Sequence, residues 1–235
     1  MGMIDLERLK DNLVRVREVI AASAARSGRA GEAVRLVAVT KTVGMEEMAA
    51  LAGLGQGDFG ESRVEQLVAR AVEAEAAGLG ARWHMIGHLQ RRKVRDLLPV
   101  GAMIHGVDSL RLAEEIEKRA AEAGLAPVAV LLEVNISGEE QKYGLWPDEM
   151  EEVVGEVAGM EHIDLRGLMT MAPLADDPEA ARPVFRGLRE LRDRINAAGF
   201  YPRPLTELSM GMSQDYAVAV EEGATLVRVG TALFK

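Results

Sequence analysis

The chain has 235 residues, of which 48% are hydrophobic, so it is long enough to bury a full core. A single eight-stranded α/β barrel takes about 250 residues, and we therefore expect one domain that covers residues 1–235. The formal net charge of -9 repels the phosphate backbone of nucleic acids, and only 4% of the residues are aromatic and able to stack on bases. We expect no nucleic-acid partner.

The sequence contains no cysteine, which excludes disulfides, thiolate nucleophiles and cysteine-ligated metal sites. The first residues carry Asp5, Glu7, Lys10 and Asp11, so they lack the uninterrupted apolar segment of a signal peptide. No later stretch is long and uncharged enough to span a bilayer. We therefore expect a cytoplasmic protein with no membrane partner.

Residues 4–26 are predicted to form an amphipathic helix. Apolar residues recur three or four positions apart along this segment, at Leu6, Leu9, Leu13, Val16 and Ile20. This period places their side chains on one face of a helix. We interpret the segment as a packing helix that precedes the repeating units of the fold.

After this helix, short apolar runs alternate with longer helical patterns. The runs predict eight strands, at residues 36–40, 58–61, 83–87, 103–108, 128–135, 165–171, 207–211 and 226–230. The helical patterns include residues 62–77, 110–123, 148–158, 178–198 and 213–222. This alternation implies βαβ units with parallel strands. The predicted class is α/β, a single (β/α)8 TIM barrel with an extra N-terminal amphipathic helix, and an open doubly wound sheet is the alternative.

Lys41 ends the first predicted strand, where the functional groups of such a barrel gather. Val37, Val39 and Lys41 share one strand face by the two-residue period, so the lysine can point inward above two core residues. An amine that is partly removed from water there becomes a better nucleophile towards carbonyl groups. The alternative is a lysine that extends from the strand end into solvent.

Small residues follow the seventh and eighth predicted strands. Residues 209–213 read Ser-Met-Gly-Met-Ser and open a helix, and Gly230 and Thr231 follow the last strand. Backbone N–H groups can approach an anion at such positions, and the loops after strands seven and eight are the usual phosphate site of this fold. Together with Lys41, these segments suggest a phosphorylated aldehyde held as a Schiff base.

Arg228 lies within an apolar strand, where an unpaired guanidinium group is costly. One interpretation pairs this arginine with a neighbouring carboxylate. The other places it beside the ring nitrogen of a pyridoxal group. Because arginine cannot accept a proton, it would keep that nitrogen unprotonated and the ring a weaker electron sink.

His84 and His88 have a spacing that is found in metal sites. The predicted change from strand to helix lies between them, so they are not expected to share a helical face. No supporting carboxylate motif is nearby. We predict no metal site.

Taken together, these segments resemble the pyridoxal phosphate homeostasis protein family, whose fold is related to the barrel domain of alanine racemase. The resemblance runs from about residue 36 to residue 234. Its motifs are AVTK at 38–41, FGE at 59–61, WHMIG at 83–87, VNIS at 134–137, GLM at 167–169, LSMGMS at 208–213 and VRVGTALF at 227–234. The chain departs from the family where Ser62-Arg63 replace the usual Asn-Tyr and Arg92 replaces a common Asn.

By this resemblance, pyridoxal 5'-phosphate (PLP) would be bound covalently to Lys41 as a Schiff base, and Arg228 would face its ring nitrogen. Met169 and His84 would line the pocket, and Ser62 is kept as the contact from the second strand. The implied cofactor-binding residues are Lys41, Ser62, His84, Met169, Ser209, Met210, Gly211, Ser213, Arg228, Gly230 and Thr231. The phosphate would lie among the residues from strands seven and eight. No catalytic residue is implied.

The resemblance favours a protein that holds PLP, serves vitamin B6 homeostasis and delivers the cofactor to apo-PLP enzymes as transient recipients. The alternative is a PLP-dependent, racemase-like enzyme, which needs an acid or base on each face of the substrate carbon. Of the tyrosines, only Tyr216 is expected near the site, and the sequence stops at Lys235, before any second domain. A Schiff-base aldolase is a third hypothesis. We expect a monomer, with a dimer as the alternative.

Overall fold

The computed structural model describes residues 5–139 and 141–235, and their strands form a closed barrel of parallel neighbours in chain order. The first and last strands pair with each other and close the ring. The strands are β1 (Arg35–Val39), β2 (Asp58–Glu61), β3 (Arg82–Met85), β4 (Met103–Val107), β5 (Val128–Glu133), β6 (Ile163–Met169), β7 (Glu207–Ser209) and β8 (Leu226–Val229). The predicted barrel is confirmed, and the predicted strand ends differ from these by no more than two residues.

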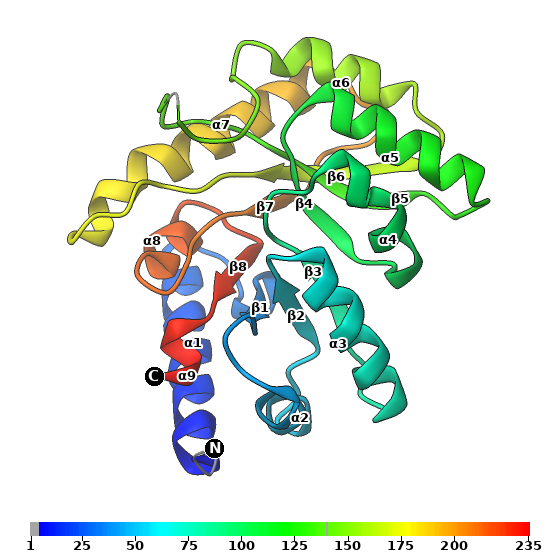
Figure 1. Ribbon diagram of the computed structural model, residues 1–235. Coiled ribbons are helices and arrows are strands. Elements are labelled where there is room, and N and C mark those ends of the chain that lie inside the picture. Colours follow the sequence, from blue (N-terminus) through cyan, green and yellow to red (C-terminus); the bar gives the residue numbers. More distant parts are fainter. Residues whose placement is uncertain (1–4, 140) are drawn as a thin grey trace.

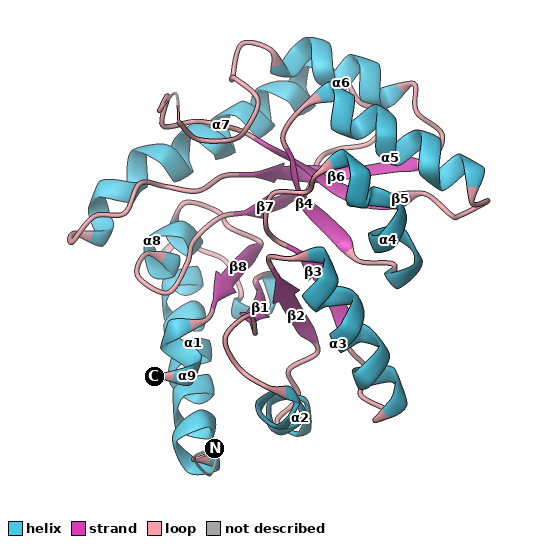
Figure 2. Ribbon diagram, viewed as in Figure 1, coloured by secondary structure: helices cyan, strands magenta, loops and turns pink. Residues whose placement is uncertain are grey.

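Helices surround the strands (Figure 2). The α-helices in the described ranges are α1 (Leu6–Arg26), α2 (Met45–Gly53), α3 (Val64–Ala76), α4 (Val94–Leu97), α5 (Leu110–Glu122), α6 (Met150–Ala158), α7 (Arg182–Ala198), α8 (Tyr216–Glu221) and α9 (Thr231–Phe234). Short 3-10 helices are η1 (Gly31–Ala33), η2 (Arg91–Lys93), η3 (Leu98–Val100) and η4 (Pro178–Ala181). None of the helices in this part of the chain has the length and apolar character needed to cross a membrane.

Helix α1 is the predicted N-terminal amphipathic helix. The Asp5 carboxylate caps it by accepting a hydrogen bond from the backbone N–H of Arg8 at 3.0 Å. The predicted first residue, Ile4, lies outside the described residues. The helix packs its apolar face beside α8 and α9, so the two ends of the described chain lie close together (Figure 1). The Asn12 side chain adds a hydrogen bond to the Leu233 carbonyl at 3.1 Å.

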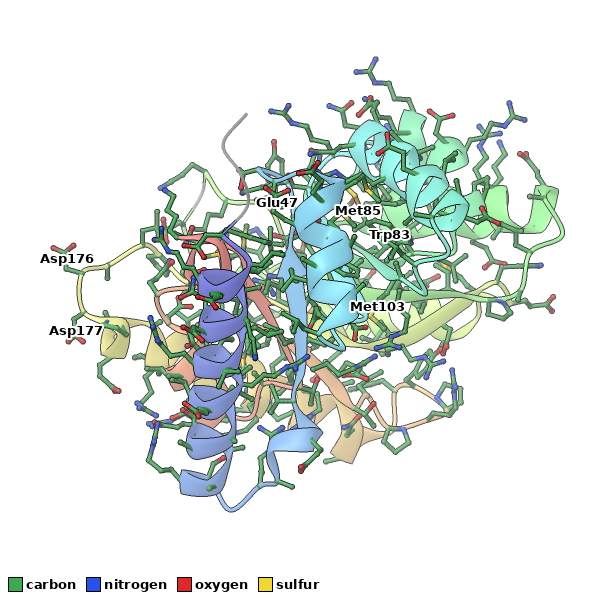
Figure 3. All side chains as sticks on the ribbon, turned by 90° about the horizontal axis from the view of Figure 1, so that it is seen from below. Glu47, Trp83, Met85, Met103, Asp176 and Asp177 are labelled. Carbon is green, nitrogen blue, oxygen red and sulfur yellow. The ribbon has the colours of Figure 1, made fainter. Side chains whose placement is uncertain are left out.

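The predicted helix over residues 178–198 is divided in the structure. A 3-10 turn, η4, precedes α7, and Pro183 is the second residue of α7. Proline lacks an N–H group, so it is tolerated in the first turn of an α-helix but not in its interior. Asp177 caps η4 by accepting from the Glu179 N–H at 3.0 Å. Asp176 and Asp177 lie at the outer edge of the molecule (Figure 3).

The strands separate two cores because successive side chains point to opposite faces. The larger core lies between barrel and helices and includes Trp83 and Met85, which lie close together in Figure 3. The smaller apolar cluster lies in the barrel interior and consists of Val37, Leu131, Met169 and Leu226. The remaining interior positions include charged and polar side chains, and these connect the barrel to the site described next.

Candidate functional site

A pocket with a cavity volume of about 330 Å³ opens at the C-terminal ends of the strands. This volume is at the lower end of the range for small-molecule sites, about 300–1,000 Å³. Residues that end or follow β1, β2, β3, β5, β6, β7 and β8 line it. The structure brings together six of the residues predicted to bind the cofactor: Lys41, Ser62, Ser213, Arg228, Gly230 and Thr231.

Lys41 lies in a turn directly after β1, and helix α3 holds this turn in place. The Gln66 side-chain amide donates to the Lys41 carbonyl at 3.0 Å. The Arg70 guanidinium donates to the carbonyls of Thr40 and Val43 on either side of it. Of the two alternatives for Lys41, the structure shows the exposed lysine. The fixed turn presents an accessible amine at the pocket.

The loops after β7 and β8 form an arc around a single oxygen atom. The Ser213 hydroxyl accepts hydrogen bonds from the backbone N–H groups of Gly230 and Ala232, each at 3.2 Å. A Cβ atom on Gly230 would lie 3.2 Å from the Val39 carbonyl oxygen, so glycine lets the chain pass close to β1. The arc therefore has the geometry to receive oxygen acceptors.

Arg228 lies on β8, is 4% exposed and lines the floor of the pocket. Its Nη1 donates to the Ser209 hydroxyl at 2.6 Å and its Nη2 to the Thr170 carbonyl at 3.0 Å. Burial lowers its pKa to about 10, while Glu133 and Asp215 raise it. No carboxylate of the described residues forms a direct ion pair with it, so a paired arginine, one of the two sequence interpretations, is not observed.

Three other predicted binding residues do not line the pocket, because each is used elsewhere. Ser209 is completely buried, and its hydroxyl is bonded to Arg228 and His105. Met210 packs in the core between barrel and helices. Gly211 has a φ of +92°, and a Cβ atom there would lie 2.6 Å from the Ala219 Cβ, so it shapes the turn after β7.

His84 and Met169, which were predicted to line the pocket, are likewise not among its lining residues. Met169 fills the apolar cluster inside the barrel. His84 is 3% exposed, and its two ring nitrogens bond to Asp58 and His105. Both side chains contact other interior side chains instead.

Glu133, at the end of β5, is a pocket residue that the sequence reasoning missed. It is 4% exposed, and burial, followed by the charge of Asp108, raises its pKa to about 7. Arg228 and His88 act in the opposite direction. The signal was present, because Glu133 is a charged residue at the end of an apolar strand, as Lys41 is.

Two aromatic rings form the wall of the pocket next to Glu133. The rings of His88 and Tyr143 are stacked with 4.1 Å between centroids, and His88 Nδ1 lies 2.8 Å from the Asp108 carboxylate. Tyr143 therefore takes the place that was predicted for Tyr216, which does not line the pocket. In the described part of the chain, no group of three or more potential ligands is placed to hold a metal ion.

Comparison with known proteins shows the relationships of the chain. The family described as "Alanine racemase, N-terminal domain" matches residues 4–235. A pyridoxal phosphate homeostasis protein of Aquifex aeolicus is 41% identical over 95% of this chain and 96% of its own length. One from Escherichia coli K12 is 37% identical over 95% of this chain and 94% of its own. The chain belongs to the pyridoxal phosphate homeostasis protein family.

Solved structures agree with this assignment. PipY of Synechococcus elongatus PCC7942, solved with PLP bound, is 30% identical to this chain and has a TM-score of 0.82. The alignment covers 97% of this chain and 100% of PipY. Alanine racemase of Clostridium difficile 630 is 18% identical, with a TM-score of 0.75. It shares the fold, and the alignment covers 98% of this chain and 56% of that enzyme. The homeostasis family is thus the nearer relationship.

Proposed function

We propose that this protein binds PLP covalently on Lys41, holds it in the cytoplasm and delivers it to apo-PLP enzymes as part of vitamin B6 homeostasis. The observation that carries the proposal is that the Lys41 amine, the Arg228 guanidinium and the Ser213–Gly230 arc line one cavity. A relative that is 30% identical over nearly the whole chain has been solved with PLP bound.

The pocket residues fit such a cofactor by their chemistry. The arc of Ser213, Gly230 and Thr231 places two hydroxyls at the pocket, beside backbone N–H groups that donate to the Ser213 oxygen and could donate to a phosphate oxygen in its place. Arg228 donates and cannot accept, so it fits a ring nitrogen that stays unprotonated. When bound, the cofactor would supply an aldehyde carbon with which the Lys41 amine could condense, with release of water. The turn held by Arg70 presents that amine where the cavity is open.

The covalent part is tested by borohydride reduction of protein loaded with PLP, followed by peptide mass mapping. We expect the pyridoxyl group on Lys41. A group found mainly on Lys93 or Lys142 would contradict the assignment.

Delivery is tested by mixing the loaded protein with an apoenzyme that depends on PLP and timing the recovery of its activity. Excess bovine albumin is added to bind any free PLP. We expect the loaded protein to restore activity under these conditions, and the same concentration of free PLP not to restore it. Recovery that follows only the free PLP concentration would contradict delivery.

A racemase-like activity is the second candidate, because Tyr143 and His88 provide acid–base groups at the pocket wall. It is tested by incubating the loaded protein with L-alanine in deuterated water and following α-proton exchange and the D-isomer. We expect little turnover, since a weak electron sink does not stabilise the carbanion that racemisation needs. Rates of about 1 per second or faster would make this an enzyme.

A further inference from the structure

A continuous chain of hydrogen bonds crosses the barrel interior from its N-terminal end to the pocket. Asp58 Oδ1 lies 2.9 Å from His84 Nε2, and His84 Nδ1 lies 2.9 Å from His105 Nε2. His105 Nδ1 lies 2.9 Å from the Ser209 hydroxyl, which is 2.6 Å from Arg228 Nη1. We call these five residues the interior chain. They come from β2, β3, β4, β7 and β8.

The two ends of the interior chain fix its direction. Arg228 can only donate hydrogen bonds, and an ionised Asp58 can only accept them. Asp58 is ionised because hydrogen bonds from His84 and then from the Arg82 guanidinium hold the pKa of its carboxyl well below the usual range, against the effect of burial. The acceptor end is therefore fixed by an ion pair at the opposite end of the barrel from the pocket.

When both imidazoles are neutral, only one arrangement satisfies every link. His84 donates from Nε2 to Asp58, so its Nδ1 accepts from the Nε2–H of His105. His105 Nδ1 then accepts from the Ser209 hydroxyl, and the Ser209 oxygen accepts from Arg228. Burial is the main cause that lowers the pKa of His105 well below its usual value, and the charges of Arg228 and Arg35 act in the same direction, so this ring is neutral.

Burial gives this arrangement energetic weight. Asp58, His84, His105, Ser209 and Arg228 are each no more than 5% exposed. A buried donor or acceptor that loses its partner costs about 1–3 kcal/mol. Breaking one hydrogen bond of the interior chain is therefore unfavourable, because water does not reach the buried groups to replace it. The chain also differs from the apolar layers that usually fill a TIM barrel interior.

We propose that Asp58 orients Arg228 towards the pocket ligand through His84, His105 and Ser209. Ser209 then acts as a positioning residue whose oxygen holds the guanidinium, and it does not contact the phosphate. The donors of Arg228 that are directed at neither Ser209 nor Thr170 remain for the ligand. The effect on PLP rests on the proposed function, whereas the direction of the hydrogen bonds does not.

The first test is the tautomeric state of His105 in the full-length protein without PLP at pH 8, by ¹⁵N NMR of labelled imidazole rings. We expect both His84 and His105 to carry their proton on Nε2. A proton on Nδ1 of His105, or a charged ring at either position, would contradict the proposed direction. Because PLP is absent, this result is independent of the Schiff base on Lys41.

The second test is the substitution Asp58→Asn, with Asp164→Asn as the matched control. Asp164 also lies at the N-terminal end of the barrel and pairs with two arginines, Arg166 and Arg203, but it has no link to the pocket. Asparagine can donate as well as accept, so Asp58→Asn allows the interior chain to reverse. We expect a second His105 tautomer and roughly 2- to 30-fold weaker PLP binding in Asp58→Asn alone.

Equal behaviour of the two aspartate variants would overturn the proposal. If Asp58→Asn does not fold, Ser209→Ala and Ser209→Thr test the proposal instead. Loss of the hydroxyl should weaken PLP binding about tenfold or more, change the visible spectrum of the loaded protein and leave the adduct on Lys41. Threonine retains the hydroxyl and should restore both properties. Unchanged affinity and spectrum in Ser209→Ala would equally contradict a role for Ser209.

Discussion

The two sides of the pocket differ in what they offer a ligand. On the β7–β8 side, the contacts are backbone N–H groups and hydroxyls arranged around Ser213 and Gly230. On the β3–β5 side, they are the ionisable and aromatic side chains of His88, Glu133 and Tyr143. The first side is fixed by the course of the chain and suits an anion. The second side is set by individual side chains, so single substitutions can change its charge and chemistry.

The largest effect is expected where the two sides meet, at Lys41. Lys41→Ala should abolish the borohydride-stable adduct completely, because the variant has no amine in the turn after β1. Residual, reversible PLP binding should remain, since the β7–β8 side is intact. Mass spectrometry and the visible spectrum measure the two effects. Lys142→Ala is the control, since that lysine pairs with Glu139, and an adduct that persists in Lys41→Ala would contradict the assignment.

On the β3–β5 side, Glu133 should make the stability of the folded protein depend on pH. Glu133 has a raised pKa of about 7 in the folded chain, against an ordinary value of 4.5. The folded state therefore binds more protons between these two pH values, and its stability falls as pH rises through them. The difference corresponds to about 3 kcal/mol. Glu133→Gln should remove this loss.

Urea unfolding of the protein without PLP at pH 5 and pH 8 measures the effect. Glu133→Gln should gain stability relative to the parent protein as the pH rises. Glu152→Gln, on the exposed face of α6, serves as the control. A constant difference between Glu133→Gln and the parent across this range would show that Glu133 is ionised in the folded protein throughout.

The β7–β8 side is tested by introducing a negative charge at Ser213. Ser213→Asp should weaken binding of PLP about tenfold or more relative to unphosphorylated pyridoxal, because a carboxylate repels the phosphate at short range. The structure selects Ser213 for this substitution, since Ser209 is buried below the pocket. Equal losses for the two ligands would place the phosphate elsewhere.

The smallest effect is expected at the aromatic wall. Tyr143 is 59% exposed, and its stacking on His88 survives the loss of its hydroxyl. Tyr143→Phe should therefore change PLP affinity less than about twofold, the range of ordinary surface substitutions. Equilibrium titration measures this, and any residual α-proton exchange should fall in the same variant if Tyr143 supplies a proton. A large loss of affinity would show that the β3–β5 side also binds the cofactor.

The sequence predicted the strands and the end of the barrel that bears the site, because both follow from local periodicity. Lys41, Ser213, Arg228, Gly230 and Thr231 were found at strand ends. Side chains whose partners lie on other strands could not be assigned in this way. The link from Ser209 to His105 joins β7 to β4, and it exists only once the barrel has closed.

Loop geometry explains the other misses. Tyr143 reaches the pocket because the segment after β5 turns back, with Val134 paired to Leu145. Nothing in the local pattern indicates this return, whereas Tyr216 follows the predicted phosphate segment directly in the sequence. Strand β7 also ends two residues earlier than predicted, because Gly211 adopts a positive φ that leaves the extended conformation.

The position of α1 has a consequence for how the chain is made. The ribosome synthesises α1 well before its packing partners α8 and α9, because nearly 190 residues separate the end of α1 from the start of α8. Strand β1 likewise cannot form its hydrogen bonds to β8 until β8 has been synthesised. Throughout most of translation, the apolar face formed by Leu9, Leu13 and Val16 has no native surface to cover it. We therefore expect this apolar face to stay exposed on the nascent chain until the last elements, α8, β8 and α9, have been synthesised.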